Sequence, residues 1–242
     1  MGPQGHVSER IGRHRLGGPF PRFELHDLDG RLWSADDLAG ARTVVFCFAS
    51  WCTCRDQLPK WQAVWEERAR AFRLLGVAQE ALGDERIREV VADAGIAFPV
   101  LVDRSSFLAA ELGFRVVPTG FFVDAAGRIA YWHFDDFDIV DPRVRLSLDA
   151  FLAGQPVESP PVEQALSPAA LALFAAGVAL SDEGDDALAL QAWRAALELD
   201  PDNFLIRSQI WVAERPDRFY PVVDRDWQSA ELIADGYEKP LP

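Results

Sequence analysis

The feature that most constrains the fold of this chain is an alternation of strand-type and helix-type segments between residues 23 and 153. The continuous apolar run Thr43–Phe48 is typical of a central strand covered on both faces. Strands alternating with helices require a mainly parallel sheet, and the last two strands predict a hairpin. The other predicted strands lie at 23–28, 31–33, 72–78, 98–102, 121–123 and 129–134, and the main helices at 55–69, 84–94, 107–112 and 142–153.

The strand pattern disappears beyond a proline- and glycine-containing linker at 154–162. Helices are predicted at 168–180, 185–199 and 203–214, with Ser167 as an N-cap and Pro168 in the first turn. The predicted organisation is a mobile lead-in at 1–18, an α/β domain at 19–153, the linker at 154–162, a helical segment at 163–215, and a partly extended, packed tail at 216–242.

Composition excludes several functions. A net charge of −14 opposes binding to nucleic acid or to an anionic membrane surface, so neither is an expected partner. No apolar run reaches the roughly 18 residues that a membrane helix needs. The first twenty residues contain no apolar core of a signal peptide, so the expected location is cytoplasmic. In a reducing compartment, three cysteines are more often buried, metal-binding or redox-active than structural.

Several motifs in a fixed order carry a family resemblance. They are P-x-F-x-L-x-D-L-D-G-R at 21–31, V-V-F-C-F-A-S-W-C at 44–52, C-R-x-x-L-P at 54–59, F-P-V-L-V-D at 98–103, L-G-F-x-V-V-P-T-G at 112–120 and V-D-x-x-G-x-I at 123–129. Residues 19–153 thereby resemble the redoxin-type thiol–disulfide oxidoreductases of the thioredoxin superfamily, which are related to alkyl hydroperoxide reductase and to ResA- and TlpA-like proteins. The resemblance implies a thioredoxin-like mixed sheet flanked by helices, and no cofactor or metal.

The resemblance also implies a site. Cys52 would attack a protein or small-molecule disulfide as a thiolate at the start of a helix, and Cys54 would resolve the mixed disulfide. Pro118 would be a cis-proline facing this loop. Val117 and Thr119 would offer backbone contacts to an extended substrate, and Trp51 would shield the site or belong to the core.

Two departures from the family pattern bear on the chemistry. The family pair is C-x-x-C, whereas this chain has C-x-C, so Cys52 must precede the helix if a disulfide is to form. We expect such a small ring to be strained, which makes the pair more oxidising than an ordinary family member. Relatives often carry an acid three residues after the resolving cysteine, but here Gln57 cannot exchange protons. That role would pass to Asp56, Glu80 or water, and Asp56 is equally explained as a solvated first-turn residue.

The helical segment resembles one tetratricopeptide helix pair, with Gly177, Ala189, Trp193, Ala196 and Pro201 at the characteristic positions. One repeat cannot bury its own apolar face. We therefore expect it to pack on the α/β domain or on a second copy, with recognition of a protein partner as the alternative.

Other interpretations of the cysteines stay open. The pair could be unreactive thiols in an interaction protein, a thiol-dependent peroxidase with an antioxidant role, or two ligands for Cu(I). The four histidines are scattered, which weakens a metal site. Cys47 is predicted to be a small buried hydrophobe and His133 an ordinary strand residue. The function best supported by the sequence is thiol–disulfide exchange through Cys52 and Cys54.

Overall fold

The core of the molecule is a five-stranded mixed sheet, seen in a computed structural model that describes residues 10–11, 14–162, 166–237, 239 and 241. Neighbouring strands run in the order β7-β6-β5-β8-β9. The first three are mutually parallel, whereas β8 is antiparallel to β5 and β9 is antiparallel to β8. The predicted thioredoxin-like sheet is therefore confirmed. The strands are β5 (Thr43–Phe48), β6 (Arg73–Ala78), β7 (Val100–Val102), β8 (Thr119–Val123) and β9 (Ile129–His133).

Strand β5 is central because its entire sequence is apolar enough to be covered on both faces. All six of its residues are buried. Cys47 in this strand lies opposite Val77 of β6 and Thr119 of β8, and it is fully buried. Burial raises the pKa of the Cys47 thiol well above its usual range. Cys47 is thus a packing residue of the sheet.

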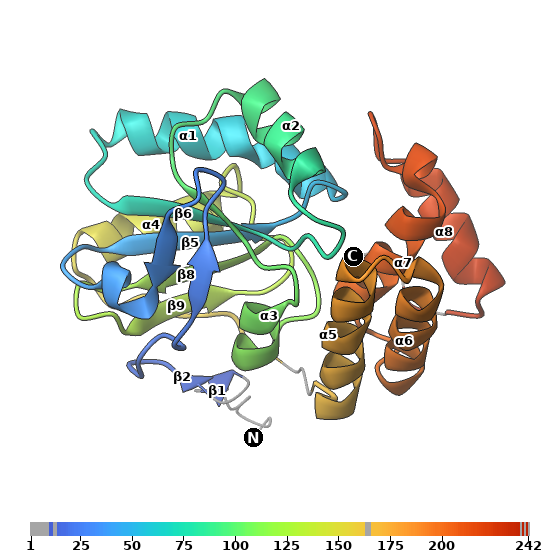
Figure 1. Cartoon of the computed structure of the whole chain (residues 1–242). Helices are drawn as coiled ribbons and strands as arrows, with labels where there is room; N and C mark the ends of the chain where they lie inside the picture. Colours follow the sequence, from blue (N-terminus) through green and yellow to red (C-terminus); the bar gives the residue numbers. More distant parts are fainter. Residues whose placement is uncertain (1–9, 12–13, 163–165, 238, 240, 242) are drawn as a thin grey trace, which may run out of the picture.

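Helices cover both faces of the sheet. On one face, α1 (Leu58–Glu67) lies beside α4 (Pro142–Leu152), and Arg145 pairs with Glu67 at 3.0 Å. Helix α3 (Phe107–Leu112) lies on the opposite side of the sheet from α1 (Figure 1). Helix α2 (Glu85–Ala94) ends at Gly95, which adopts the left-handed conformation that favours glycine.

Parts of the segments predicted as lead-in and linker contact the sheet domain. Residues 1–9 and 12–13 of the predicted lead-in lie outside the described residues. Gly17 N donates to Ile129 O at 2.8 Å, which ties the end of the lead-in to β9. Ser159 in the linker is buried, and its hydroxyl accepts a hydrogen bond from Trp132 N at 3.0 Å. Two short antiparallel pairs precede the sheet: β1 (Arg10–Ile11) with β2 (His14–Arg15), and β3 (Glu24–His26) with β4 (Leu32–Ser34).

The C-terminal part of the chain is all-helical, as predicted, and sits beside the sheet domain (Figure 1). Helices α5 (Pro168–Asp182) and α6 (Asp186–Leu199) form a hairpin. Its close approach requires Gly177, because a Cβ there would collide with the indole of Trp193. Trp193 Nε1 donates to Phe174 O at 3.1 Å. These contacts explain the small and aromatic positions, while the tetratricopeptide assignment itself stays a prediction.

Helix α7 (Phe204–Glu214) joins the helical hairpin to the sheet domain. It is buried along almost its whole length. Ile206 and Ile210 belong to the core of the helical hairpin, whereas Leu205 and Trp211 belong to the core of the sheet domain. The helical segment therefore packs on its own chain, which is one of the two arrangements expected from the sequence.

The predicted extended tail contains a helix that the sequence analysis missed. Helix α8 spans Arg225–Ala234, and its N-cap Asp224 accepts a hydrogen bond from Trp227 N at 2.9 Å. Trp227 packs edge-on against Trp211 of α7, with ring centroids 5.6 Å apart. The helix is held by this tertiary packing more than by its own weak apolar pattern.

Candidate active site

The Cys52–Cys54 loop follows the carboxyl end of strand β5. Cys52 is the N-cap of a 3-10 turn, Thr53–Gln57, and has an extended backbone with φ −102° and ψ 142°. The turn continues directly into α1. Cys52 and Cys54 form a disulfide across a Cα–Cα distance of 5.1 Å. Cys52 thus lies outside the helical turns, as the spacing of the two cysteines requires.

The two sulfurs differ in exposure. Cys54 is buried at 4% exposed, whereas Cys52 is partly exposed. Cys52 Sγ accepts a hydrogen bond from Cys54 N at 3.1 Å. Cys52 is therefore the more accessible of the two disulfide sulfurs.

The loop before strand β8 faces Cys52. Val117 O lies 3.6 Å from Cys52 Sγ, and the Val117–Pro118 peptide bond is cis, as the resemblance implies. Thr119 is fully buried, and its hydroxyl donates to Val116 O at 2.8 Å. Trp51 is buried in the core, and its indole donates to Gln79 O at 3.1 Å. Trp51, Val117 and Pro118 thus lie near the cysteines. Thr119, the residue after Pro118, is buried in the interior.

Behind the loop, a buried carboxyl holds the residue two positions before Cys52. Glu80 follows the carboxyl end of β6, and both of its oxygens bond to Ser50, one to the backbone N and one to the hydroxyl, the latter at 3.0 Å. The Ser50 hydroxyl also lies 2.6 Å from the Tyr220 hydroxyl. Ser50 and Tyr220 did not emerge from the sequence, because nothing local links positions 170 residues apart.

Burial raises the pKa of Glu80 to about 8. The bonds from Ser50 and the charge of Arg55 oppose this rise without cancelling it. When Glu80 is protonated, its hydroxyl donates to Ser50 Oγ, which then donates to Tyr220. When Glu80 is ionised, both bonds reverse, and the Ser50 hydroxyl donates to the carboxylate. The protonation of Glu80 therefore sets the direction of a hydrogen-bond chain beside the cysteines.

The other candidate proton carriers have different surroundings. Gln57 is buried, and its side-chain oxygen accepts a hydrogen bond from Ile139 N at 3.2 Å. Gln57 therefore joins the turn after the cysteines to the loop before α4. Asp56 is exposed. Of the acids considered from the sequence, Glu80 is the one that contacts the loop.

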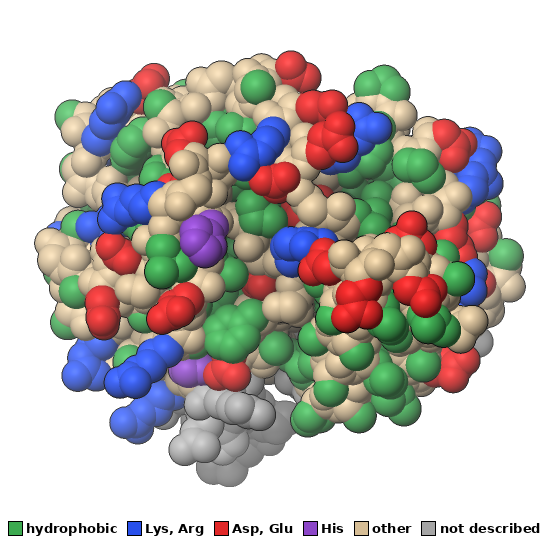
Figure 2. All heavy atoms as spheres, viewed as in Figure 1, with side chains coloured by type: hydrophobic (Ala, Val, Ile, Leu, Met, Phe, Trp, Pro, Cys, Tyr) green, Lys and Arg blue, Asp and Glu red, His purple; other side chains and the backbone are tan. Residues whose placement is uncertain are grey.

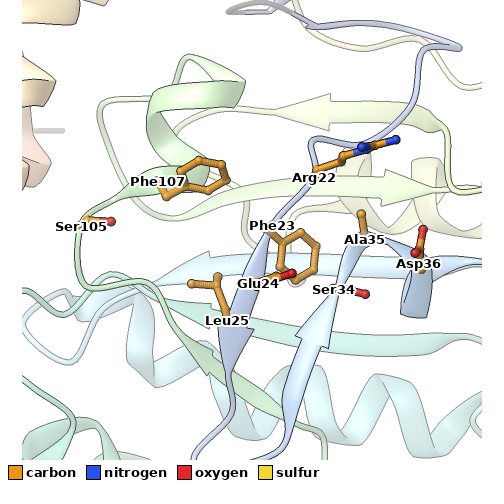
Figure 3. Close-up of a pocket in the computed structure, with 9 residues that line it drawn as sticks. All are labelled: Arg22, Phe23, Glu24, Leu25, Ser34, Ala35, Asp36, Ser105 and Phe107. Carbon is orange, nitrogen blue, oxygen red and sulfur yellow. The ribbon is translucent and has the colours of Figure 1, made fainter.

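The described residues form further cavities but no metal cluster. Among the described residues, no three His, Cys, Asp or Glu side chains converge on a metal position. A cavity of about 680 Å³ lies between β3, β4 and the start of α3, and Figure 3 shows Arg22, Glu24 and Phe107 around it. The residues that line this cavity include neither cysteine of the pair.

Comparisons with known proteins agree with this fold. Residues 16–132 match the family described as the AhpC/TSA family. The thiol-disulfide oxidoreductase ResA of Bacillus thuringiensis is 22% identical over 117 residues, covering 48% of this chain and 67% of that protein. The thioredoxin-like protein YneN of Bacillus subtilis is 24% identical over 136 residues, covering 55% of this chain and 79% of that protein.

A solved structure shows the same fold. A putative thiol:disulfide interchange protein DsbE from Chlorobium tepidum superposes with a TM-score of 0.50 at 24% identity, covering 57% of this chain and 99% of that one. The sheet domain therefore has the thioredoxin-like fold. Residues 16–132 are similar to the AhpC/TSA family, and the two curated relatives are a thiol-disulfide oxidoreductase and a thioredoxin-like protein. The matched range ends in β9, so helices α4 to α8 lie beyond it.

On the molecular surface, acidic and basic side chains are interspersed over the face shown in Figure 2. In the described part of the chain, no helix has the length and apolar character needed to cross a membrane.

Proposed function

We propose that this protein is a thiol–disulfide oxidoreductase in which Cys52 attacks and Cys54 resolves. The observation that carries the proposal is the Cys52–Cys54 disulfide at the start of the α1 helical region, with Cys52 facing the cis-proline loop. The partly exposed sulfur is the attacking one and the buried sulfur is the resolving one.

The reaction starts from the reduced pair. The Cys52 thiolate attacks one sulfur of a substrate disulfide, which forms a mixed disulfide and releases the first substrate thiolate. The Cys54 thiolate then attacks Cys52 Sγ, which releases the second substrate thiolate and forms the Cys52–Cys54 disulfide. Two electrons pass from the protein dithiol to the substrate. Run in reverse, the same steps oxidise a substrate dithiol.

Single cysteine variants test this assignment. We expect C54S to accumulate a mixed disulfide through Cys52 and C52S to lose exchange by about 10³-fold or more, because the attacking thiolate is gone. Mass spectrometry of the trapped adduct and the rate of disulfide reduction provide the measurements. C47A is the matched control, since Cys47 is buried within the sheet and should leave the rate unchanged.

Two results would contradict the proposal. If C52S and C54S keep the wild-type rate, the thiols are incidental. If either variant consumes hydrogen peroxide at the wild-type rate while no mixed disulfide is trapped, the chemistry is that of a one-cysteine peroxidase.

A further inference from the structure

The C-terminal helical segment reaches the one sulfur that a substrate must contact. A small cavity of about 40 Å³ adjoins Cys52. Trp51, Thr53, Val116 and Val117 of the sheet domain line one side. The other side is formed by the C-terminal region, through Phe204, Ser208, Val223, Arg225, Gln228 and Leu241. Cys52 therefore sits in a cleft with two walls, and the second wall comes from beyond the AhpC/TSA-family range.

The C-terminal region that forms the second wall is hydrogen-bonded to the sheet domain close to Cys52. Leu205 N donates to Arg115 O at 3.0 Å, two residues before the Val117 that faces Cys52. Gln209 Nε2 donates at 3.0 Å to Gln79 O, which also accepts from the indole of Trp51. These bonds tie helix α7 to the loop that faces the cysteines and to the end of β6.

Further bonds hold the chain after α7. The Tyr220 hydroxyl meets Ser50, and Arg55 Nη2, one residue beyond the cysteine pair, donates to Pro221 O at 2.5 Å. A salt bridge between Arg115 and Asp200, at 3.1 Å, supports the start of α7. The wall is therefore fixed at several points on both sides of Cys52.

The space beside Cys52 limits what can enter. The free space of this cavity, about 40 Å³, is much smaller than the about 680 Å³ of the cavity between β3, β4 and α3. Little room is therefore left beside the sulfur. A flexible small disulfide can present a sulfur while the rest of the molecule stays at the opening. A disulfide in a protein chain is flanked by backbone on both sides, which needs more room beside the sulfur than this cavity provides.

We infer that the C-terminal region, through the residues between positions 204 and 241 that line this cavity, makes this protein selective for small, flexible disulfides over disulfides within protein chains. This inference rests on the proposed function, because it names the substrate class of the same Cys52. The selectivity is steric: the cleft excludes protein backbone, and the exchange steps at sulfur are unchanged.

Two aliphatic disulfides of different size test the inference on the full chain. The reduced protein, freed of reductant, is mixed with glutathione disulfide or with insulin. Each rate is divided by the rate of dithiothreitol with the same disulfide, which removes the difference in intrinsic reactivity. We expect the normalised rate with insulin to be lower by on the order of tenfold to a hundredfold, the range that pocket shape commonly supplies.

A pair of double variants tests whether the wall is the cause. V223A/L241A trims two apolar side chains that line the cleft. V222A/I233A removes the same number of carbon atoms from side chains that are 74% and 77% exposed and do not line it. We expect V223A/L241A to raise the insulin rate several-fold with little change for glutathione disulfide, and V222A/I233A to change neither rate.

The outcomes separate this inference from the proposed function. Equal normalised rates for the two disulfides in the wild type overturn the selectivity. A V223A/L241A variant as selective as the wild type overturns the role of the wall. Reaction with neither disulfide, and no mixed disulfide in C54S, overturns the proposed function and this inference with it.

Discussion

The outer and inner faces of the Cys52–Cys54 loop meet different surroundings. On the outer face, Cys52 is partly exposed and borders a cleft with only about 40 Å³ of free space. On the inner face, Ser50 is fully buried and is held by Glu80 and Tyr220. The inner face therefore holds the loop in place, whereas the outer face carries the sulfur that attacks in the proposed function. The C-terminal region contributes to both faces, through Val223 outside and Tyr220 inside.

The largest expected effect is the pH dependence of the free energy of unfolding, which arises from Glu80 on the inner face. The pKa of Glu80 rises from 4.5 to about 8 on folding, so the folded protein binds the proton more tightly than the unfolded chain. This contribution to stability is fully present below pH 4.5 and is lost as the pH rises toward 8, by on the order of 4 kcal/mol. In E80Q the amide replaces the protonated carboxyl and cannot titrate. We expect the free energy of unfolding of E80Q to fall less between pH 5 and 8.

Urea unfolding of the wild type and E80Q at several pH values measures this difference. E89Q is a matched control, because Glu89 is an exposed acid paired with Arg86 on the surface. If the free energies of unfolding of the wild type and E80Q change in parallel with pH, Glu80 is ionised across this range. The inner face then does not hold a proton.

The second expected effect is a difference in reduction potential between this pair of cysteines and an ordinary C-x-x-C pair. With a single residue between them, Cys52 and Cys54 close a smaller ring, so we expect the pair to be more oxidising than thioredoxin. A potential about 30 to 60 mV above −270 mV corresponds to about 1.4 to 3 kcal/mol. Equilibration with glutathione redox buffers gives the potential. Inserting one glycine between Thr53 and Cys54 should lower it, and a wild-type value at or below about −270 mV would refute the prediction.

Much of the fold could be predicted from the sequence because its signals are local. The apolar run Thr43–Phe48 identified the central strand, and the order of motifs identified the thioredoxin-like sheet. The tail could not be predicted in the same way. Helix α8 has an N-cap at Asp224, but its stability depends on contacts such as Trp211 with Trp227, which only the folded chain brings together.

The same distinction between local sequence signals and long-range contacts applies to the candidate site. Cys52 and Cys54 are visible because both lie in one short motif after a predicted strand. Glu80 could be considered from the sequence only as one of several acids, and its contact with Ser50 spans 30 residues. Part of the lining of the cavity beside Cys52 comes from residues after position 200. The sequence of that region contains no motif that indicates contact with the cysteines. Local patterns thus specify the reactive atoms, whereas long-range packing specifies their surroundings.

The smallest expected effect tests whether the inner face only positions the loop. Y220F removes the hydroxyl that bonds to Ser50 Oγ and should cost about 1 kcal/mol of unfolding free energy. Y237F is the matched control, because the Tyr237 hydroxyl donates to Asp202 at 3.0 Å and not to Ser50. We expect faster hydrogen exchange at the Ser50 amide in Y220F alone, with exchange rates toward glutathione disulfide within about twofold of wild type in both. A large loss of rate in Y220F without a loss of stability would instead place Tyr220 in the chemistry, and the two faces of the loop would no longer have separate roles.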